Sequence, residues 1–196
     1  MSLHNQTNIT NFVVEIPDCN ITKAFKLNAQ SVLIPGIRMP VTDVPAGTKG
    51  LARASLPGST VEFDPFVCRF VVDEELDSWL ELYKWMISIN SYLAYDGNGF
   101  EDGVLPKFIT LHILDNSRTK IALSIHFYGA WCADIGEVEY NTTESTDIPV
   151  TSIATFHYKY MEVEKNGKII IKRQSIKEQA LANGKGNTAA VHPSMR

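Results

Sequence analysis

Residues 60–91 determine the fold class, and they read TVEFDPFVCRFVVDEELDSWLELYKWMISINS. The first part of this stretch, residues 60–72, is dense in β-branched and aromatic residues, which predicts a strand. Pro65 lies inside that run and cannot donate a hydrogen bond to a neighbouring strand, so we expect an edge position or a bulge there. A strand that leads directly into the following segment is therefore the first expected element.

The second part of the stretch predicts a helix over residues 73–91. Asp73 is a suitable N-cap, and Glu74, Glu75 and Asp77 place carboxylates in the first turn, where the helix dipole favours them. Apolar residues then recur at spacings of three and four, which is typical of a helix with one face in the core. We expect Trp79 to lie in that core, so that Trp79→Asp prevents folding. The apolar positions are Leu76, Trp79, Leu80, Tyr83, Trp85, Met86, Ile87 and Ile89.

Toward the N-terminus, residues 11–16 and 24–34 are apolar-rich runs that end at Pro17-Asp18 and Pro35-Gly36, and both are predicted to be strands. Residues 37–59 contain three prolines and three glycines with little periodicity, which indicates a long extended loop. Residues 1–10 are polar and are expected to form an arm that is mobile or ordered by a partner.

The second half of the chain is rich in strand signals. Residues 107–114 and 119–128 alternate apolar and polar side chains around the turn-forming residues 115–118, which predicts a hairpin. Residues 135–140 and 149–163 are predicted to be further strands, the last of them long and continuous. Asn166-Gly167 is a strong hairpin-turn signal before three isoleucines, and residues 164–196 form a C-terminal extension. The chain is thus predicted to be mostly β, an antiparallel β-sandwich or barrel with one flanking α-helix.

Composition excludes several functional classes. The 196 residues carry a formal net charge of −4, which gives no general reason to bind nucleic acid tightly. No apolar run reaches the roughly 18 to 20 residues of a membrane-spanning helix. The N-terminus lacks the basic and apolar regions of a secretory signal, so the protein is expected to stay in the compartment where it is made.

The residues that could bind a metal or act in catalysis do not form a recognisable site. His112, His126 and His157 all fall in predicted strands and, with Cys132, leave a metal site as an alternative, but their spacing provides no local ligand pair. Catalysis by Cys132 is a further alternative, but no residue near Cys132 in the sequence could serve as its general base. The simplest interpretation is that Cys19, Cys68 and Cys132 are three reduced thiols, most of them buried.

Other motifs are equally weak. Residues 96–103 resemble a calcium loop but lack three required ligand or glycine positions, and Gly184-Lys185-Gly186 lies in a tail rather than between a strand and a helix. We therefore expect no catalytic residue, no metal site, no cofactor-binding site and no enzyme activity. A docking surface for anions or a partner remains an alternative at the basic residues of the C-terminal region, which are Lys165, Lys168, Lys172, Arg173, Lys177 and Lys185.

An ordered set of segments resembles one known family. Residues 11–16, residues 32–36, residues 70–74 with Trp79 and Trp85, residues 109–115, residues 127–131 with residues 135–137, and residues 154–160 together resemble the tail tube proteins of contractile-tailed bacteriophages. The similarity extends over residues 11–163, and its strength is in the order of the segments rather than in any single motif.

The resemblance implies a structural subunit whose six copies close into a homo-hexameric ring, with rings stacked into the tube through which viral DNA leaves. It implies as partners further copies of the chain, the tail sheath protein, and baseplate and tail terminator proteins, with transient passage of DNA and no membrane. Residues 37–59 would be an inter-ring loop, and residues 1–10 and 164–196 would reach adjacent rings or the sheath. The expected location is the virion tail, assembled in the host cytoplasm.

Three alternatives stay open at this point. A baseplate tube-initiator or a tail terminator shares the fold but makes a single ring. The tube protein of a bacterial secretion system would carry protein instead of DNA. A β-barrel enzyme or ligand-binding protein would show a pocket with convergent polar groups.

Overall fold

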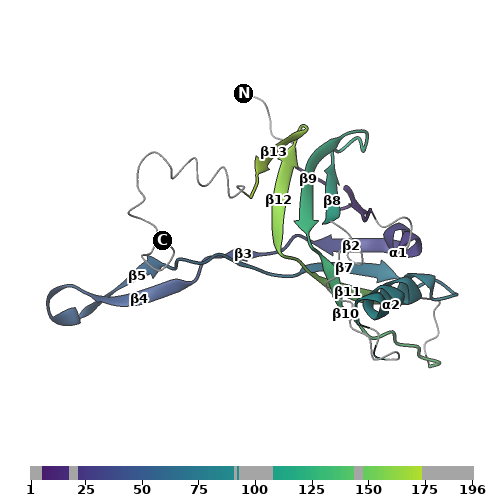
Figure 1. The fold of residues 1–196 in the computed structure, drawn as a ribbon, viewed down its shortest axis with the longest axis horizontal. Helices are drawn as coiled ribbons and strands as arrows, with labels where there is room; N and C mark the ends of the chain where they lie inside the picture. The colour runs from purple at the N-terminus through teal and green to yellow at the C-terminus, as the bar shows by residue number, and fades with distance from the viewer. Residues whose placement is uncertain (1–5, 18–21, 91, 93–107, 144–147, 174–196) are drawn as a thin grey trace, which may run out of the picture.

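The computed structural model describes residues 6–17, 22–90, 92, 108–143 and 148–173, which form two antiparallel sheets, a projecting arm and two helices (Figure 1). The first sheet has the strand order β1-β8-β9-β12-β13. Its strands are β1 (Phe12–Glu15), β8 (Phe108–Leu114), β9 (Ile121–Tyr128), β12 (Tyr160–Lys165) and β13 (Lys168–Ile171). The second sheet has the order β10-β11-β7-β2, with β10 (Trp131–Ile135), β11 (Thr151–His157), β7 (Phe66–Val71) and β2 (Ala29–Leu33).

The two sheets face each other across an aromatic core, which accounts for the predicted sandwich. Phe127 of β9 stacks on Phe66 of β7 with ring centroids 4.8 Å apart, so it joins the first sheet to the second. Phe156 of β11 lies 5.9 Å from Phe66 and 5.8 Å from Trp85, again between centroids. Buried aromatic residues remove large apolar areas from water, so this cluster contributes strongly to the hydrophobic stabilisation of the fold.

Helix α2 (Asp77–Ile89) is the predicted helix, but it begins four residues later than the sequence suggests. Asp73 lies outside the helix, where its carboxylate accepts hydrogen bonds from the N–H groups of Asp77 (2.9 Å) and Ser78 (3.0 Å). The intervening turn places Leu76 at a left-handed φ of 57°. The N-cap position itself belongs to Leu76, so Asp73 caps the helix from outside it, and of the three predicted first-turn carboxylates only Asp77 lies in the first turn.

Residues 24–34 are not one strand, as the sequence predicts, but helix α1 (Lys23–Asn28) followed by β2. The cause is a distant residue of α2. The Glu81 carboxylate accepts the N–H groups of Ala24 (3.1 Å) and Phe25 (3.0 Å), which have no partner within the helix. Because the start of this helix depends on a side chain more than 50 residues away, the sequence around residues 23–28 contains no signal that predicts it.

Three other strand predictions need correction. Residues 60–72 divide into β6 (Glu62–Phe63) and β7, and Pro65 lies between the two strands. Because β7 is paired on both sides, the expected edge position is wrong. Residues 149–163 are not one strand but β11 and β12, which belong to different sheets. Residues 135–140 contribute only Ile135 to a strand, because regular pairing with β11 ends there.

The predicted hairpins are confirmed. β8 and β9 pair over their whole length around residues 115–118, and Ile109, Leu111, Ile125 and Phe127 are buried on one face as the alternation indicates. β12 and β13 are joined by Asn166-Gly167, whose φ values of 53° and 74° suit a tight hairpin turn. No helix in the described ranges is long and apolar enough to cross a membrane.

Candidate assembly surfaces

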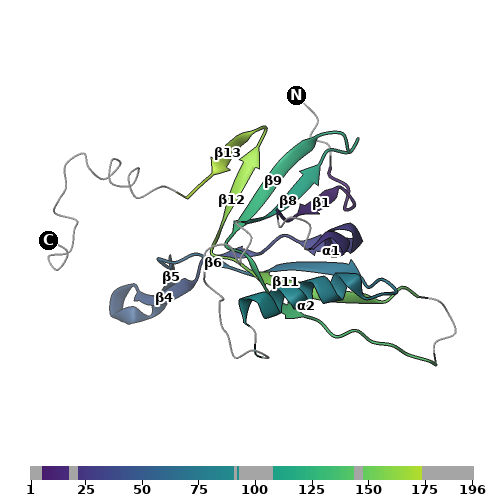
Figure 2. The same cartoon turned by 45° about the vertical axis from the view of Figure 1, so that its right-hand side comes forward.

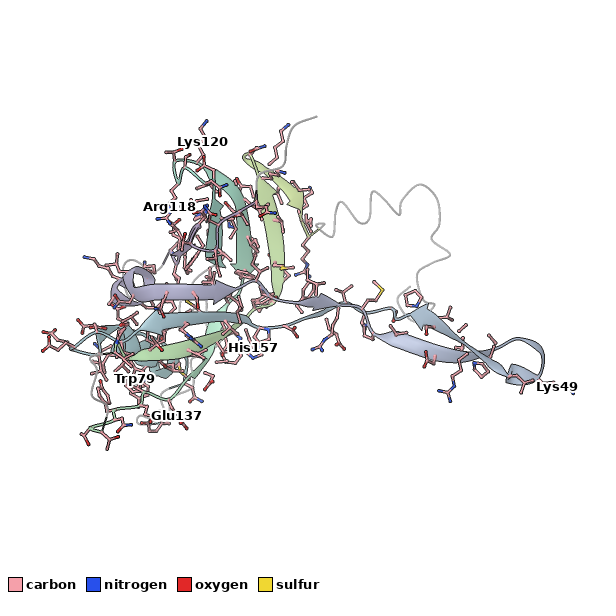
Figure 3. All side chains as sticks on the ribbon, turned by 180° about the vertical axis from the view of Figure 1, so that it is seen from behind. Lys49, Trp79, Arg118, Lys120, Glu137 and His157 are labelled. Carbon is pink, nitrogen blue, oxygen red and sulfur yellow. The ribbon has the colours of Figure 1, made fainter. Side chains whose placement is uncertain are left out.

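The most prominent surface is an arm formed by residues 37–63, which continues from β2 and returns to β7 (Figure 1). It contains β3 (Ile37–Arg38) paired with β6, and β4 (Val41–Ala46) paired with β5 (Ala52–Pro57). A short 3-10 turn at Thr48–Gly50 closes the tip. Figure 3 shows Lys49 at this tip, far from Trp79 and His157 in the body. The predicted loop is thus a projecting β-hairpin, and its pairing was missed because prolines and glycines interrupt the pattern.

The base of the arm is tied to the body. Asp64 accepts from Arg38 (Nη2 to Oδ1, 2.9 Å), and its backbone carbonyl accepts from the Tyr158 hydroxyl at 3.0 Å. Phe63 packs toward the same tyrosine, with centroids 6.5 Å apart. The Gly58 N–H donates to the Pro40 carbonyl at 2.7 Å, which closes the neck between the two ladders. These contacts set the direction in which the arm leaves the sandwich.

The β4–β5 ladder has two unlike faces. Cross-strand partners point to the same side, so Asp43 and Ser55 share one face, where the Ser55 hydroxyl donates to the Asp43 carboxylate at 2.9 Å. The opposite face is apolar apart from Thr42, and consists of Thr42, Val44, Ala46, Ala52, Ala54 and Leu56. Large apolar side chains are also exposed along the arm and its root, at Leu33, Ile34, Ile37, Met39, Val41, Leu51, Leu56, Val61 and Phe63.

Exposed apolar area of this extent is uncommon on a protein that works alone, and it is typical of a surface that a partner covers. The small alanine side chains on the apolar face allow close approach of another backbone. The arm therefore has the properties of a docking element rather than of a substrate-binding loop.

A second surface is the outer face of the first sheet, where two hydrogen-bonded rows cross the strands. His112 contacts the Glu15 carboxylate (Nε2 to Oε2, 3.0 Å) and the Ser124 hydroxyl (Nδ1 to Oγ, 2.9 Å). His126 contacts the Glu164 carboxylate (Nε2 to Oε2, 3.0 Å) and the Thr110 hydroxyl (Nδ1 to Oγ1, 3.0 Å). Both ring nitrogens of each histidine are engaged, so the rows hold β1, β8, β9 and β12 side by side.

The structure does not bring the other metal candidates to these histidines. His157 lies on β11 in the other sheet, where its ring stacks on Trp131 with centroids 5.7 Å apart, and Cys132 is buried in the core. The described residues contain no group of three or more His, Cys, Asp or Glu side chains with metal-binding geometry. The residues of the calcium-like loop and of the Gly184-Lys185-Gly186 motif lie outside the described ranges.

The cysteines give no sign of a nucleophile. Cys68 and Cys132 are free and buried, and burial raises the pKa of each thiol to about 12. A thiol with so high a pKa is almost entirely protonated near neutral pH, whereas the thiolate is the reactive form. The interpretation of Cys68 and Cys132 as buried thiols is confirmed, and Cys19 lies outside the described residues.

The N-terminal segment is held along the β8–β9 turn where the structure describes it. Asn116 donates to the Gln6 carbonyl at 2.9 Å, and Arg118 donates to the Thr10 hydroxyl (Nη2 to Oγ1, 2.7 Å). Figure 3 shows Arg118 and Lys120 at this end of the first sheet, away from the arm. Residues 6–10 of the predicted arm therefore lie against the body.

Comparisons with solved structures place this arrangement in a class. The chain covers 95% of the tube terminating cap of the anti-feeding prophage, with a TM-score of 0.57, 11% identity and 84% of this chain matched. It covers 99% of the sheath/tube terminator of the extracellular contractile injection system PVC, with a TM-score of 0.57, 14% identity and 83% of this chain matched. The fold is therefore the tail-tube fold of contractile injection machines, as the sequence resemblance predicted.

A sequence comparison goes further. The chain is 53% identical over 168 residues to the tail tube terminator protein of Enterobacteria phage T4, a match that covers 86% of this chain and 94% of that protein. No protein-family model matches the chain. At this identity and coverage, the chain belongs to the tail tube terminator family and is a structural component of contractile phage tails. Between the two predicted roles, the terminator alternative is better supported than the stacked tube subunit.

Proposed function

We propose that this protein terminates the tail tube of a contractile phage tail, as a single homo-hexameric ring that sits on the last ring of tube subunits. One observation carries the proposal, namely the 53% identity to a tail tube terminator along 94% of that protein's length. The tail-tube fold supports it, because a ring built on the same fold as the tube has a matching diameter and a matching contact face.

The arm is the element that we expect to reach the tube. It extends from one side of the sandwich (Figure 2), and the apolar face of its β4–β5 ladder is suited to lie on the adjoining ring. The predicted inter-ring role of residues 37–59 becomes, for a terminator, attachment to the tube end. Contacts with the sheath are a second part of the proposal, whereas the baseplate lies at the opposite end of the tail.

The role is mechanical and electrostatic, with no catalytic step. Viral DNA passes through the ring on its way out, and a weakly interacting wall favours that passage. Six copies at −4 each carry a formal charge of −24, which repels phosphates and limits adhesion of the DNA. We place assembly in the host cytoplasm, where the tail is built.

Negative-stain electron microscopy distinguishes a terminator from a tube subunit. The purified chain, alone and concentrated, should give single rings or free subunits without stacking. Mixed with tail tubes of the same phage, it should place one ring at one end of each tube and stop further addition of tube protein. Long hollow tubes made of this chain alone would contradict the proposal and restore the tube-subunit role.

A further inference from the structure

The second sheet has an open outer face, which is the side turned away from the aromatic core. Ala154 and Cys68 are cross-strand partners and both are buried, so the next pair along the ladder, Ile153 and Arg69, points outward. Ile153 is exposed by 40%, and Leu33 at the other side of the same face is exposed by 65%. The apolar side chains on this face are Leu33, Val67, Val71, Trp131 and Ile153.

An aromatic stack lies at one end of this outer face. Trp131 of β10 and His157 of β11 are cross-strand partners, and their rings stack with centroids 5.7 Å apart. Trp131 is nevertheless exposed by 40%, so much of a large apolar side chain is in contact with water. Tryptophan and arginine are enriched among the residues that carry most of the binding energy at protein interfaces. The outer face contains both types.

Arg69 lies in the middle of the apolar face without an ionic partner. Its cross-strand neighbours are Ile153 on β11 and Ser31 on β2, and no ion pair or hydrogen bond in the described part of the chain involves its guanidinium. Asp134 shares the face by register but lies two strands away, on the edge strand β10. Covering a guanidinium with apolar surface is unfavourable unless a carboxylate pairs with it. A partner that covers this face must therefore bring an acidic side chain to Arg69.

The charges on the two outer faces of the sandwich distinguish the channel side of a ring from its outside. The outer face of the first sheet carries three carboxylates, those of Glu15, Glu162 and Glu164, against one guanidinium, that of Arg173. In a ring whose wall is one sandwich thick, one outer face lines the channel and the other faces outward. The acidic face repels DNA phosphates and suits the channel. The face around Arg69 is then directed outward, toward the sheath.

We propose that the outer face of the second sheet docks a protein of the sheath layer, which presents a carboxylate to Arg69 and apolar side chains to Ile153 and Trp131. The proposal rests on the sheath contact of the proposed function and identifies the surface that makes it. A guanidinium and a carboxylate can form two parallel hydrogen bonds, which fix the orientation of the partner, while the apolar contacts around them exclude water. DNA is a poorer match for this face, because one guanidinium neutralises only one phosphate.

Photo-cross-linking in assembled tails identifies the occupant. Ile153 is replaced by the photoreactive residue p-benzoylphenylalanine, tails of the same phage are assembled with this chain, and cross-linked peptides are sequenced by mass spectrometry. Cross-links should join position 153 to a sheath-layer protein, in a segment that contains Asp or Glu. Val13 is exposed on the outer face of the first sheet and is the control position, which should give no cross-link to the sheath layer. Cross-links from position 153 to the tube protein, to a second copy of this chain or to DNA would overturn the proposal, as would their absence.

A charge variant gives an independent readout. Arg69→Glu should lower the yield of the cross-link from position 153 by about tenfold or more, because it opposes the partner's carboxylate with a like charge. Arg69→Lys keeps the charge without the planar fork and should retain part of the yield. Lys120→Glu is the matched control, since Lys120 lies exposed at the far end of the first sheet (Figure 3), and it should leave the yield unchanged.

Two further measurements separate this surface from the terminator role. Arg69→Glu should keep the circular dichroism spectrum and Tm of the unmodified subunit and should still place one ring on tube ends. An unchanged cross-link yield in Arg69→Glu would overturn the docking role of Arg69 and leave the terminator role standing. Failure of the unmodified chain to form a ring on tube ends would instead count against the terminator role.

Discussion

Asp73 shows how one residue can start a helix from outside it. Its partial burial raises the carboxyl pKa, but hydrogen bonds from the Ser78 hydroxyl and from the N–H groups of Ser78 and Asp77 outweigh that effect and lower the pKa from 3.8 to about 2. Because the folded-state pKa lies below the unfolded one, the stabilisation is present above pH 4 and is lost as the pH falls toward 2.

We therefore predict that Asp73→Asn makes the free energy of unfolding less dependent on pH in the acid range. Between about pH 5 and pH 2, the wild-type free energy of unfolding should fall further than that of the variant, since only the wild type loses an ionised cap. Urea unfolding followed by circular dichroism at several pH values measures both slopes. Equal slopes for the two proteins would refute a role for this carboxylate in acid sensitivity.

The two tryptophans of α2 differ in burial, and Trp79 packs against the edge of the core instead of lying inside it as expected. Trp85 is buried against Phe156, whereas Trp79 is only partly buried and stacks on Tyr83 with centroids 5.2 Å apart. Trp85→Ala should lower the free energy of unfolding by about 3 to 5 kcal/mol. Trp79→Ala should cost clearly less and leave a folded protein, as measured by urea unfolding; equal losses would contradict this placement.

At the scale of elements, the arm should be separable from the sandwich. The Gly58 N–H already donates to the Pro40 carbonyl, so replacing residues 41–57 by an Asn-Gly turn rejoins chain ends that lie side by side. We predict that the Tm changes by no more than about 4 °C, because the body keeps its core. Attachment to tube ends should be lost in electron micrographs.

A point variant tests whether attachment to the tube requires the apolar face of the arm or only the presence of the arm. Val44→Asp places a charge on the apolar face and should also abolish attachment. Asp43→Asn, one residue away on the opposite face, is the matched control and should attach normally. Normal attachment of Val44→Asp would mean that this face is not the one that meets the tube.

Helices and strands were predictable from the sequence where the local apolar pattern indicates the same element that the tertiary contacts stabilise. Residues 109–113 and 123–127 alternate apolar and polar side chains, and the strands that contain them pair with each other, so both strands were predicted closely. Residues 149–163 also look continuous, but Tyr158 and Lys159 carry the chain from one sheet to the other, and nothing local specifies which partner each half takes. The functional surfaces followed the same rule. The composition of residues 37–59 indicated an exposed excursion, whereas the two histidine rows of the first sheet depend on strands that meet only in the fold.

At the scale of the whole molecule, local stability should be graded from the core to the arm. β7, β9 and β11 are each paired on both sides or packed on the aromatic core, whereas β4 and β5 pair mainly with each other. Hydrogen exchange of the free subunit should therefore be slowest in β7, β9 and β11 and fast in β4 and β5. Protection of β4 and β5 should rise on tube attachment, and unchanged exchange there would contradict docking through the arm.

The continuity of the arm with β2 and β7 has a mechanical consequence. A pull on the arm acts along the axes of these two strands, and β7 lies between β2 and β11. Such a force shears the ladder hydrogen bonds together instead of opening them one after another. In the proposed attachment to the tube, a load on the arm would thus be shared by the centre of a sheet, and we expect the joint between body and arm to be strongest along the direction of the arm.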